Sequence, residues 1–149
     1  RNYDYDEMLN VPLIIHVPGS DIRTTIHRTG GQIDFMPTIL NIMGIKPGND
    51  TFILGQDIIN SKEGFVAFTS YLFDGSFVTD EVMFEISREG IFEGSRAWRI
   101  GTNEEVDAKE YKEQYEKALL LKKTSKEILE QNLIADYIEH ERPDSPGTE

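Results

Sequence analysis

The sequence predicts an α/β fragment followed by a small α+β subdomain, and three patterns carry this prediction. Residues 1–63 contain an apolar run of strand length and an amphipathic helix, which together are typical of a parallel α/β core. Residues 64–141 combine short strands rich in aromatic and β-branched residues with a long helical pattern, which indicates an antiparallel sheet covered by a helix. Residues 142–149 have too little apolar surface to order themselves, so we expect a disordered tail.

The first element is the apolar run at residues 11–17, which follows a polar lead-in that contains Asp4 and Asp6. A strand covered on both faces is apolar at nearly every position, so the run predicts a buried parallel strand. His16 lies inside it and has no acidic partner at ligand spacing, so we interpret it as a hydrogen-bonded structural histidine rather than a metal ligand. Asp4 and Asp6 lack a third carboxylate or a histidine, so an exposed lead-in is favoured over acid–base chemistry.

The second element is a helix over residues 34–44. The Asp34 carboxylate can accept the free N–H groups of the first turn, and Gly44 can end the helix in a left-handed conformation. Asp34 is therefore predicted to be a structural helix cap, not a metal ligand. The apolar positions form one stripe with helical spacing: Met36, Ile39, Leu40 and Met43.

The second half predicts a meander and a helix. Runs at residues 65–73, 76–79, 82–86 and 97–100 are separated by Gly-containing turns, as in antiparallel strands. Residues 104–141 show apolar positions about four apart with Lys and Glu between them. Thr124 and Glu127 have capping-box spacing and allow two helices, but one long helix is favoured because no Gly or Pro interrupts the pattern.

One basic cluster is a candidate for substrate binding. Arg23, His27 and Arg28 lie in the loop at residues 18–33, which leaves the carboxyl end of the predicted parallel strand. Enzymes of the α/β class bind their ligands at that edge of the sheet. His27 and Arg28 are therefore the predicted substrate-binding residues, facing a phosphate group, with a solvated loop as the alternative.

Composition excludes several classes of function. The net charge of −12 argues against nucleic acid as a partner, and phosphate chemistry would need a metal or local basic residues. The chain has no Cys, which rules out disulfides and thiol chemistry. Cations need several converging ligands, and no such pattern is visible, so we expect no cofactor and no tight metal site in this chain.

The order of motifs resembles a known family. It reads Val-Pro-Leu-Ile-Ile-His-Val-Pro-Gly at residues 11–19, Gly-Gly-Gln-Ile-Asp-Phe-Met-Pro-Thr at residues 30–38 and Gly-Gln-Asp at residues 55–57. This order resembles the late part of the sulfatase-like branch of the alkaline phosphatase superfamily, and in particular the lipoteichoic acid synthases, which are phosphoglycerol transferases. The resemblance covers residues 1–60 well and the remainder in outline.

The resemblance implies a larger parent protein. The chain starts at Arg1, and the family's metal ligands and Thr or Ser nucleophile precede the apolar strand, so we expect the C-terminal end of an extracellular catalytic domain. The implied parent uses a divalent metal, manganese, at the outer face of a Gram-positive cell membrane. Its implied substrates are phosphatidylglycerol and a glycerol-phosphate polymer, and this segment's implied partner is the N-terminal remainder of the domain.

Two alternatives stay open. One is a fragment of a sulfatase or phosphodiesterase that acts on soluble esters, and the other is a non-catalytic assembly module. In each case we expect the isolated chain to be inactive. Because the predicted parallel strand lacks neighbours in this sequence, we also expect the isolated chain to expose apolar surface or to form a homodimer.

Overall fold

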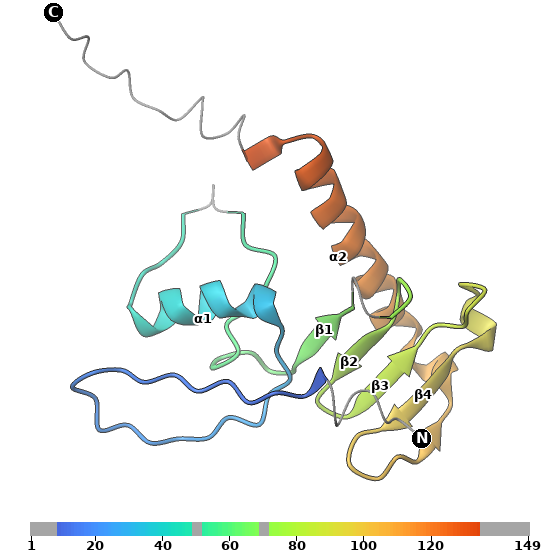
Figure 1. The fold of residues 1–149 in the computed structure, drawn as a ribbon, viewed down its shortest axis with the longest axis horizontal. Helices are drawn as coiled ribbons and strands as arrows, with labels where there is room; N and C mark the ends of the chain where they lie inside the picture. Colours follow the sequence, from blue (N-terminus) through green and yellow to red (C-terminus); the bar gives the residue numbers. More distant parts are fainter. Residues whose placement is uncertain (1–8, 49–51, 69–71, 135–149) are drawn as a thin grey trace, which may run out of the picture.

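The computed structural model describes residues 9–48, 52–68 and 72–134, and it contains a five-stranded sheet, two α-helices and several single-turn helices (Figure 1). Helix α2 lies across one face of the sheet, whereas α1 and a long extended loop lie to one side of it (Figure 1). The fold is therefore α+β in the part that the structure describes.

The sheet is an antiparallel meander, as predicted. Its strands pair in chain order, and every neighbouring pair is antiparallel. The strands are β1 (Phe65–Ala67), β2 (Phe77–Thr79), β3 (Val82–Glu85), β4 (Arg96–Arg99) and β5 (Glu105–Val106). Strand β5 is a correction, because helix was predicted from Glu104. Its pairing of Val106 with Ala97 completes the sheet before the helix begins.

One face of the sheet packs on α2 (Lys112–Glu130). Side chains alternate along each strand, so Phe77, Phe84 and Ala97 all point to this face and are fully buried. The rings of Phe77 and Phe84 stack with centroids 4.7 Å apart, and Phe84 lies 6.0 Å from Tyr115 of the helix. This aromatic layer is the main core.

The other face of the sheet carries a second cluster. Val78, Met83 and Trp98 are cross-strand neighbours, and they pack against Leu9 and Phe68 among others. Both faces of the central strands are therefore covered, which explains why β2 and β3 are apolar at successive positions instead of alternating with polar residues.

Helix α2 is continuous through Thr124, as favoured from the sequence. It follows a single turn, η4 (Ala108–Tyr111), at which the Asp107 carboxylate accepts the Lys109 N–H at 3.0 Å. Among the residues that the structure describes, no helix is long and apolar enough to cross a membrane.

The predicted buried parallel strand is wrong for this chain. Residues 11–17 lie in an extended loop without strand pairing, and Val11 and Ile14 are 76% and 87% exposed. A strand needs a neighbour for its backbone hydrogen bonds, and the described part of the chain offers none. His16 is exposed and lies in this loop, so its predicted position inside a buried strand is also wrong.

Helix α1 (Phe35–Ile42) forms where it was predicted but buries a different face. Thr38 is its fully buried residue, whereas Met36 and Met43 of the expected apolar stripe are 51% and 65% exposed. The Thr38 hydroxyl donates to the Asp34 carbonyl at 2.6 Å and accepts the Ile58 N–H at 3.1 Å. The helix is thus attached in part by polar contacts, and its apolar stripe is only partly covered, since Ile39 and Leu40 are half-buried.

Some predictions fall outside the described residues. These include the lead-in with Asp4 and Asp6, residues 69–71 of a predicted strand, residues 135–141 of the predicted helix, and the tail at residues 142–149.

Candidate functional site

The candidate site centres on Asp80, in the turn between β2 and β3. Its carboxylate accepts the Thr29 N–H at 2.6 Å and the Gly64 N–H at 2.8 Å. It also accepts a hydrogen bond from Arg28 Nη1 at 2.7 Å, which makes an ion pair. Three segments that are distant in the sequence therefore meet at one carboxylate.

The Asp80 carboxyl is an ionised anchor. Burial raises the pKa of this group. The N–H groups of Thr29 and Gly64 and the Arg28 guanidinium together lower it by more, so the net pKa lies below the ordinary 3.8. The side chains of Arg28 and Asp80 are 27% and 23% exposed, which places the pair at the edge of solvent.

Gly64 permits this arrangement because it has no side chain. A Cβ at this position would collide with an Asp80 carboxylate oxygen and with the backbone of Thr29. The close approach lets the Gly64 N–H reach the carboxylate, and it sets the start of β1 against the loop that carries Arg28.

Arg28 is held by more than one contact. Its Nη1 also donates to the Lys62 carbonyl at 2.8 Å. The Nε of the same guanidinium is buried and has no hydrogen-bond partner among the described residues. One side of the guanidinium is thus fixed to the protein, whereas the Nε on the other side is unused.

A cleft of about 790 Å³ opens beside this anchor, between the loop at Arg28, the start of β1, the β2–β3 turn and the first turns of α2. Cationic and anionic side chains both line it, and Lys117 Nζ lies 4.3 Å from the centre of the Phe65 ring. Gln114 also lines the cleft, and its Oε1 is buried without a hydrogen-bond partner among the described residues.

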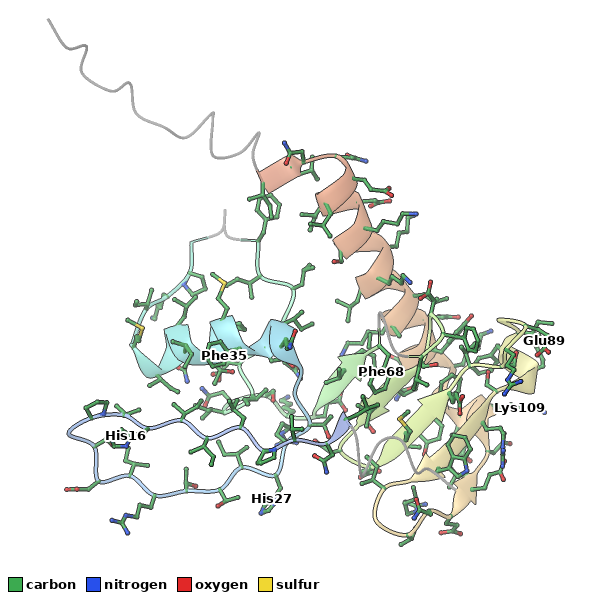
Figure 2. All side chains as sticks on the ribbon, viewed as in Figure 1. His16, His27, Phe35, Phe68, Glu89 and Lys109 are labelled. Atoms are coloured by element: carbon green, nitrogen blue, oxygen red, sulfur yellow. The ribbon has the colours of Figure 1, made fainter. Side chains whose placement is uncertain are left out.

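The structure separates the predicted binding residues. His16 and His27 lie on the two arms of the extended loop and do not converge (Figure 2). His27 is exposed, whereas its neighbour Arg28 is half-buried in the anchor and lines the cleft. Of the two residues predicted to bind substrate, Arg28 is the one that the fold places in a cleft.

Asp34 has a structural role, but the detail of the predicted cap is wrong. Its carboxylate makes no hydrogen bond to the first turn of α1. It accepts the Gly31 N–H at 2.8 Å and the Gln56 N–H at 2.7 Å, and the residue is only 2% exposed. Asp34 therefore caps the preceding single turn, η2 (Gln32–Asp34), and ties it to the segment around Gln56.

The described residues do not offer a set of ligands for a metal. No group of three or more His, Cys, Asp or Glu side chains lies close enough to hold an ion in the described ranges. Carboxylates of the cleft are bound to Arg28 or exposed, so the donor set does not fit a divalent cation.

Sequence reasoning missed Asp80 and Gln114. Asp80 follows a short strand at a turn, where an acidic residue is common, and its partners Arg28 and Thr29 lie about fifty residues upstream. The Asp80-Glu81 pair between two apolar runs was the available signal, but it indicates a turn and not an anchor.

Comparison with known proteins identifies relatives of this segment. No protein-family model matches the chain. Over 84 residues it is 32% identical to the lipoteichoic acid synthase-like protein YvgJ of Bacillus subtilis strain 168, a match that covers 55% of this chain and 13% of that protein. The crystal structure of the lipoteichoic acid synthase LtaP from Listeria monocytogenes superposes with a TM-score of 0.70 at 28% identity, over 77% of this chain and 28% of that one.

The chain thus spans less than a third of either relative. The agreement of a sequence match with a fold match supports the resemblance seen in the motifs at residues 11–57. This chain is related to a segment of the lipoteichoic acid synthase family.

Proposed function

We propose that this chain is the C-terminal segment of a phosphoglycerol transferase that moves glycerol phosphate from phosphatidylglycerol to a growing polymer. The observation that carries the proposal is the joint match in sequence and fold to lipoteichoic acid synthases. The catalytic Thr and the ligands of a divalent metal, manganese in this proposal, would lie in the remainder of the parent domain.

The exposed apolar surface supports a role as part of a larger domain. Val11 and Ile14 of the extended loop are exposed, and Phe35 and Met36 of α1 are about half exposed. Apolar side chains in a run of strand length stabilise the fold when neighbouring strands cover them. We propose that the remainder of the catalytic domain covers this surface, at the outer face of a Gram-positive cell membrane.

Within that domain, this segment would supply a support rather than the chemistry. The Asp80 anchor fixes Arg28 and Thr29 of the loop to the sheet, and Asp34 fixes the start of α1 to the segment near Gln56. Both contacts orient loops that connect to the exposed apolar run. His27 and Arg28 would then face the substrate side of the assembled domain.

The proposal is tested by complementation in a Gram-positive strain that lacks its lipoteichoic acid synthase. The complete parent gene should restore a glycerol-phosphate polymer, and the same gene without residues 64–134 should not. In vitro, the parent's extracellular part should release diacylglycerol from phosphatidylglycerol with manganese, whereas this chain alone should not.

The same assays separate the alternatives. Hydrolysis of soluble sulfate or phosphate esters without transfer to a polymer would favour the sulfatase or phosphodiesterase alternative. A parent that is inactive toward every ester but still binds other proteins would favour the assembly module.

A further inference from the structure

The second face of the sheet is deeply buried although neither helix covers it. Its cluster of Val78, Met83 and Trp98 is called here the second-face cluster. Met83 is 1% exposed and Trp98 is 6% exposed. Helix α2 packs on the opposite face, and α1 lies to one side of the sheet (Figure 1). A side chain on a sheet face leaves solvent only when a further layer of residues lies over it, so this face requires a cover besides the two helices.

A distant part of the chain reaches this face at Leu9. The described hydrophobic residues packed against the second-face cluster are Leu9, Val66, Phe68, Leu72 and Ile100. The last four lie in the strands or in the segments that adjoin them, whereas Leu9 lies far upstream of β1. Leu9 is also the first residue that the structure describes. The chain that precedes it therefore starts from a point on this face.

The eight residues before Leu9 have the pattern and the length to continue across the face. They read Arg-Asn-Tyr-Asp-Tyr-Asp-Glu-Met. In an extended chain, alternate side chains point to the same side, so Tyr3 and Tyr5 share the side of Leu9. Asp4 and Asp6 fall on the opposite side, toward water. Eight extended residues reach about 26 Å and five strands are about 19 Å across, so the segment is long enough.

Charge favours this segment over a second copy of the chain. The net charge of −12 makes two copies repel one another. Within one chain, Glu7 falls on the same side as Leu9, and the face offers it a cation. The Arg96 guanidinium lies over the Trp98 ring, 4.9 Å from the ring centroid, and the Arg96 side chain is 57% exposed. An acidic segment with two aromatic rings therefore matches both the apolar cluster and its cationic rim.

We propose that residues 1–8 form a strap across the second face of the sheet, with Tyr3 and Tyr5 against the second-face cluster. Tyrosine suits this position because its ring packs on apolar side chains while its hydroxyl reaches water. The strap fixes one end of the loop at residues 9–30 to the sheet, and the contact of Thr29 with Asp80 fixes the other end. The exposed apolar run at residues 11–17 is thus held between two contacts with one sheet. This strap lies within the chain, so it does not depend on the proposed function.

Trp98 reports on this face by itself, because it is the single tryptophan of the chain. The test compares the fluorescence of the full chain with that of a chain that lacks residues 1–8. Removal should shift Trp98 emission to longer wavelength and increase its quenching by acrylamide, because the indole becomes exposed to water. Tyr5→Ser should give a smaller change in the same direction. Asp4→Ser is the matched control and should give none, and thermal unfolding checks that each variant is folded.

A spin label supplies a second measurement that needs no truncation. The chain has no Cys, so Asp4→Cys carries one nitroxide on the outer side of the strap. The label should broaden the NMR signals of the Trp98 indole N–H and the Met83 methyl group. Adding Tyr5→Ser to the labelled chain should reduce the broadening, because the strap then leaves the sheet. Glu130→Cys, at the end of α2, should leave both signals sharp, since α2 covers the opposite face.

Three results would overturn the proposal. The first is unchanged Trp98 emission and quenching in a folded chain without residues 1–8. If that chain does not fold, the absence of broadening from the Asp4→Cys label has the same meaning. The second is a shift in Tyr71→Ser but not in Tyr5→Ser, which would assign the cover to the connection between β1 and β2. The third is Trp98 emission that changes with protein concentration, which would assign the cover to a second copy.

Discussion

Two regions of this chain have similar apolar content but are stabilised in different ways. The sheet and α2, over residues 64–134, contain all the buried apolar side chains that the structure describes, from Phe65 to Ala118. Residues 9–63 contain apolar runs of comparable length, yet their buried residues are Asp34 and Thr38. An apolar side chain forms a core only when other elements cover it. Within residues 9–63, polar contacts to loops stabilise the structure instead of an apolar core.

This difference shows that residues 9–63 depend on the sheet and α2 for their position. The Asp80 anchor joins Thr29 and Arg28 to the sheet, so the folded sheet holds a loop that has little core of its own. Substitutions in the sheet should therefore be the most damaging, those at the polar contacts should come next, and those in the exposed apolar run should matter least.

The largest effect is expected for Phe84→Ala. Phe84 is fully buried and stacks on Phe77, so its truncation should lower the free energy of unfolding by about 3–5 kcal/mol. Phe35→Ala is the matched control in the first region, where the side chain is 50% exposed, and should cost about 1 kcal/mol or less. Urea denaturation measures both, and equal losses would contradict the division into two regions.

The next effect is expected at the anchor. Asp80→Ala leaves two backbone N–H groups and a guanidinium without their acceptor, which should cost about 3 kcal/mol. Asp74→Ala is the control, because its ion pair with Lys122 is exposed and such pairs contribute about 1 kcal/mol or less. Similar losses in the two variants would mean that Asp80 is an ordinary surface residue.

The anchor also predicts a pH dependence. The pKa of Asp80 is lower in the folded chain than its ordinary 3.8, so folding favours the ionised form. This contribution is fully present above the ordinary pKa and is lost as the pH falls through the folded pKa, below 3.8. The difference in free energy of unfolding between the unsubstituted chain and Asp80→Asn should therefore shrink between pH 5 and pH 3. A constant difference would contradict the ionised anchor.

A smaller effect is expected at Asp34. Asp34→Ala removes the acceptor of two partly buried N–H groups and should lower the free energy of unfolding by about 2 kcal/mol. Asp34→Asn keeps one acceptor oxygen, so it should recover about half of this loss. Ser is too short to reach Gln56 as well, so a full rescue by Asp34→Ser would restore the simple helix cap expected from the sequence.

The smallest change in stability is expected in the exposed run. Ile14→Ser should change the free energy of unfolding by about 0.5 kcal/mol or less, because Ile14 is 87% exposed. The same variant should reduce hydrophobic-dye binding and self-association, measured by fluorescence and light scattering. Ile91→Ser, 54% exposed at the β3–β4 turn, is the control. If the unsubstituted chain is a monomer and binds no dye, this apolar surface is already covered.

Local patterns predicted most of the sheet and α2, although they placed β5 in the helix. Short runs rich in aromatic and β-branched residues and the Gly turns between them predicted the meander, and an uninterrupted apolar period predicted a single helix through Thr124. These elements are local and their partners are adjacent in the sequence, so local preference and tertiary packing agree. The family resemblance, carried by motifs over residues 11–57, was also present in the sequence alone.

The tertiary structure decided which apolar side chains are buried and which distant residues come into contact. The sequence determined that residues 11–17 are apolar, but not that the described chain leaves them without a neighbouring strand. It determined that Asp34 precedes a helix, but its partner at Gln56 lies beyond local spacing. Arg28 was visible as a candidate, whereas Asp80 and Gln114 were not, because the Arg28–Asp80 pair joins residues 52 positions apart and the cleft is lined by segments that are distant in the sequence. Backbone preference acts over a few residues, and only folding brings such distant groups together.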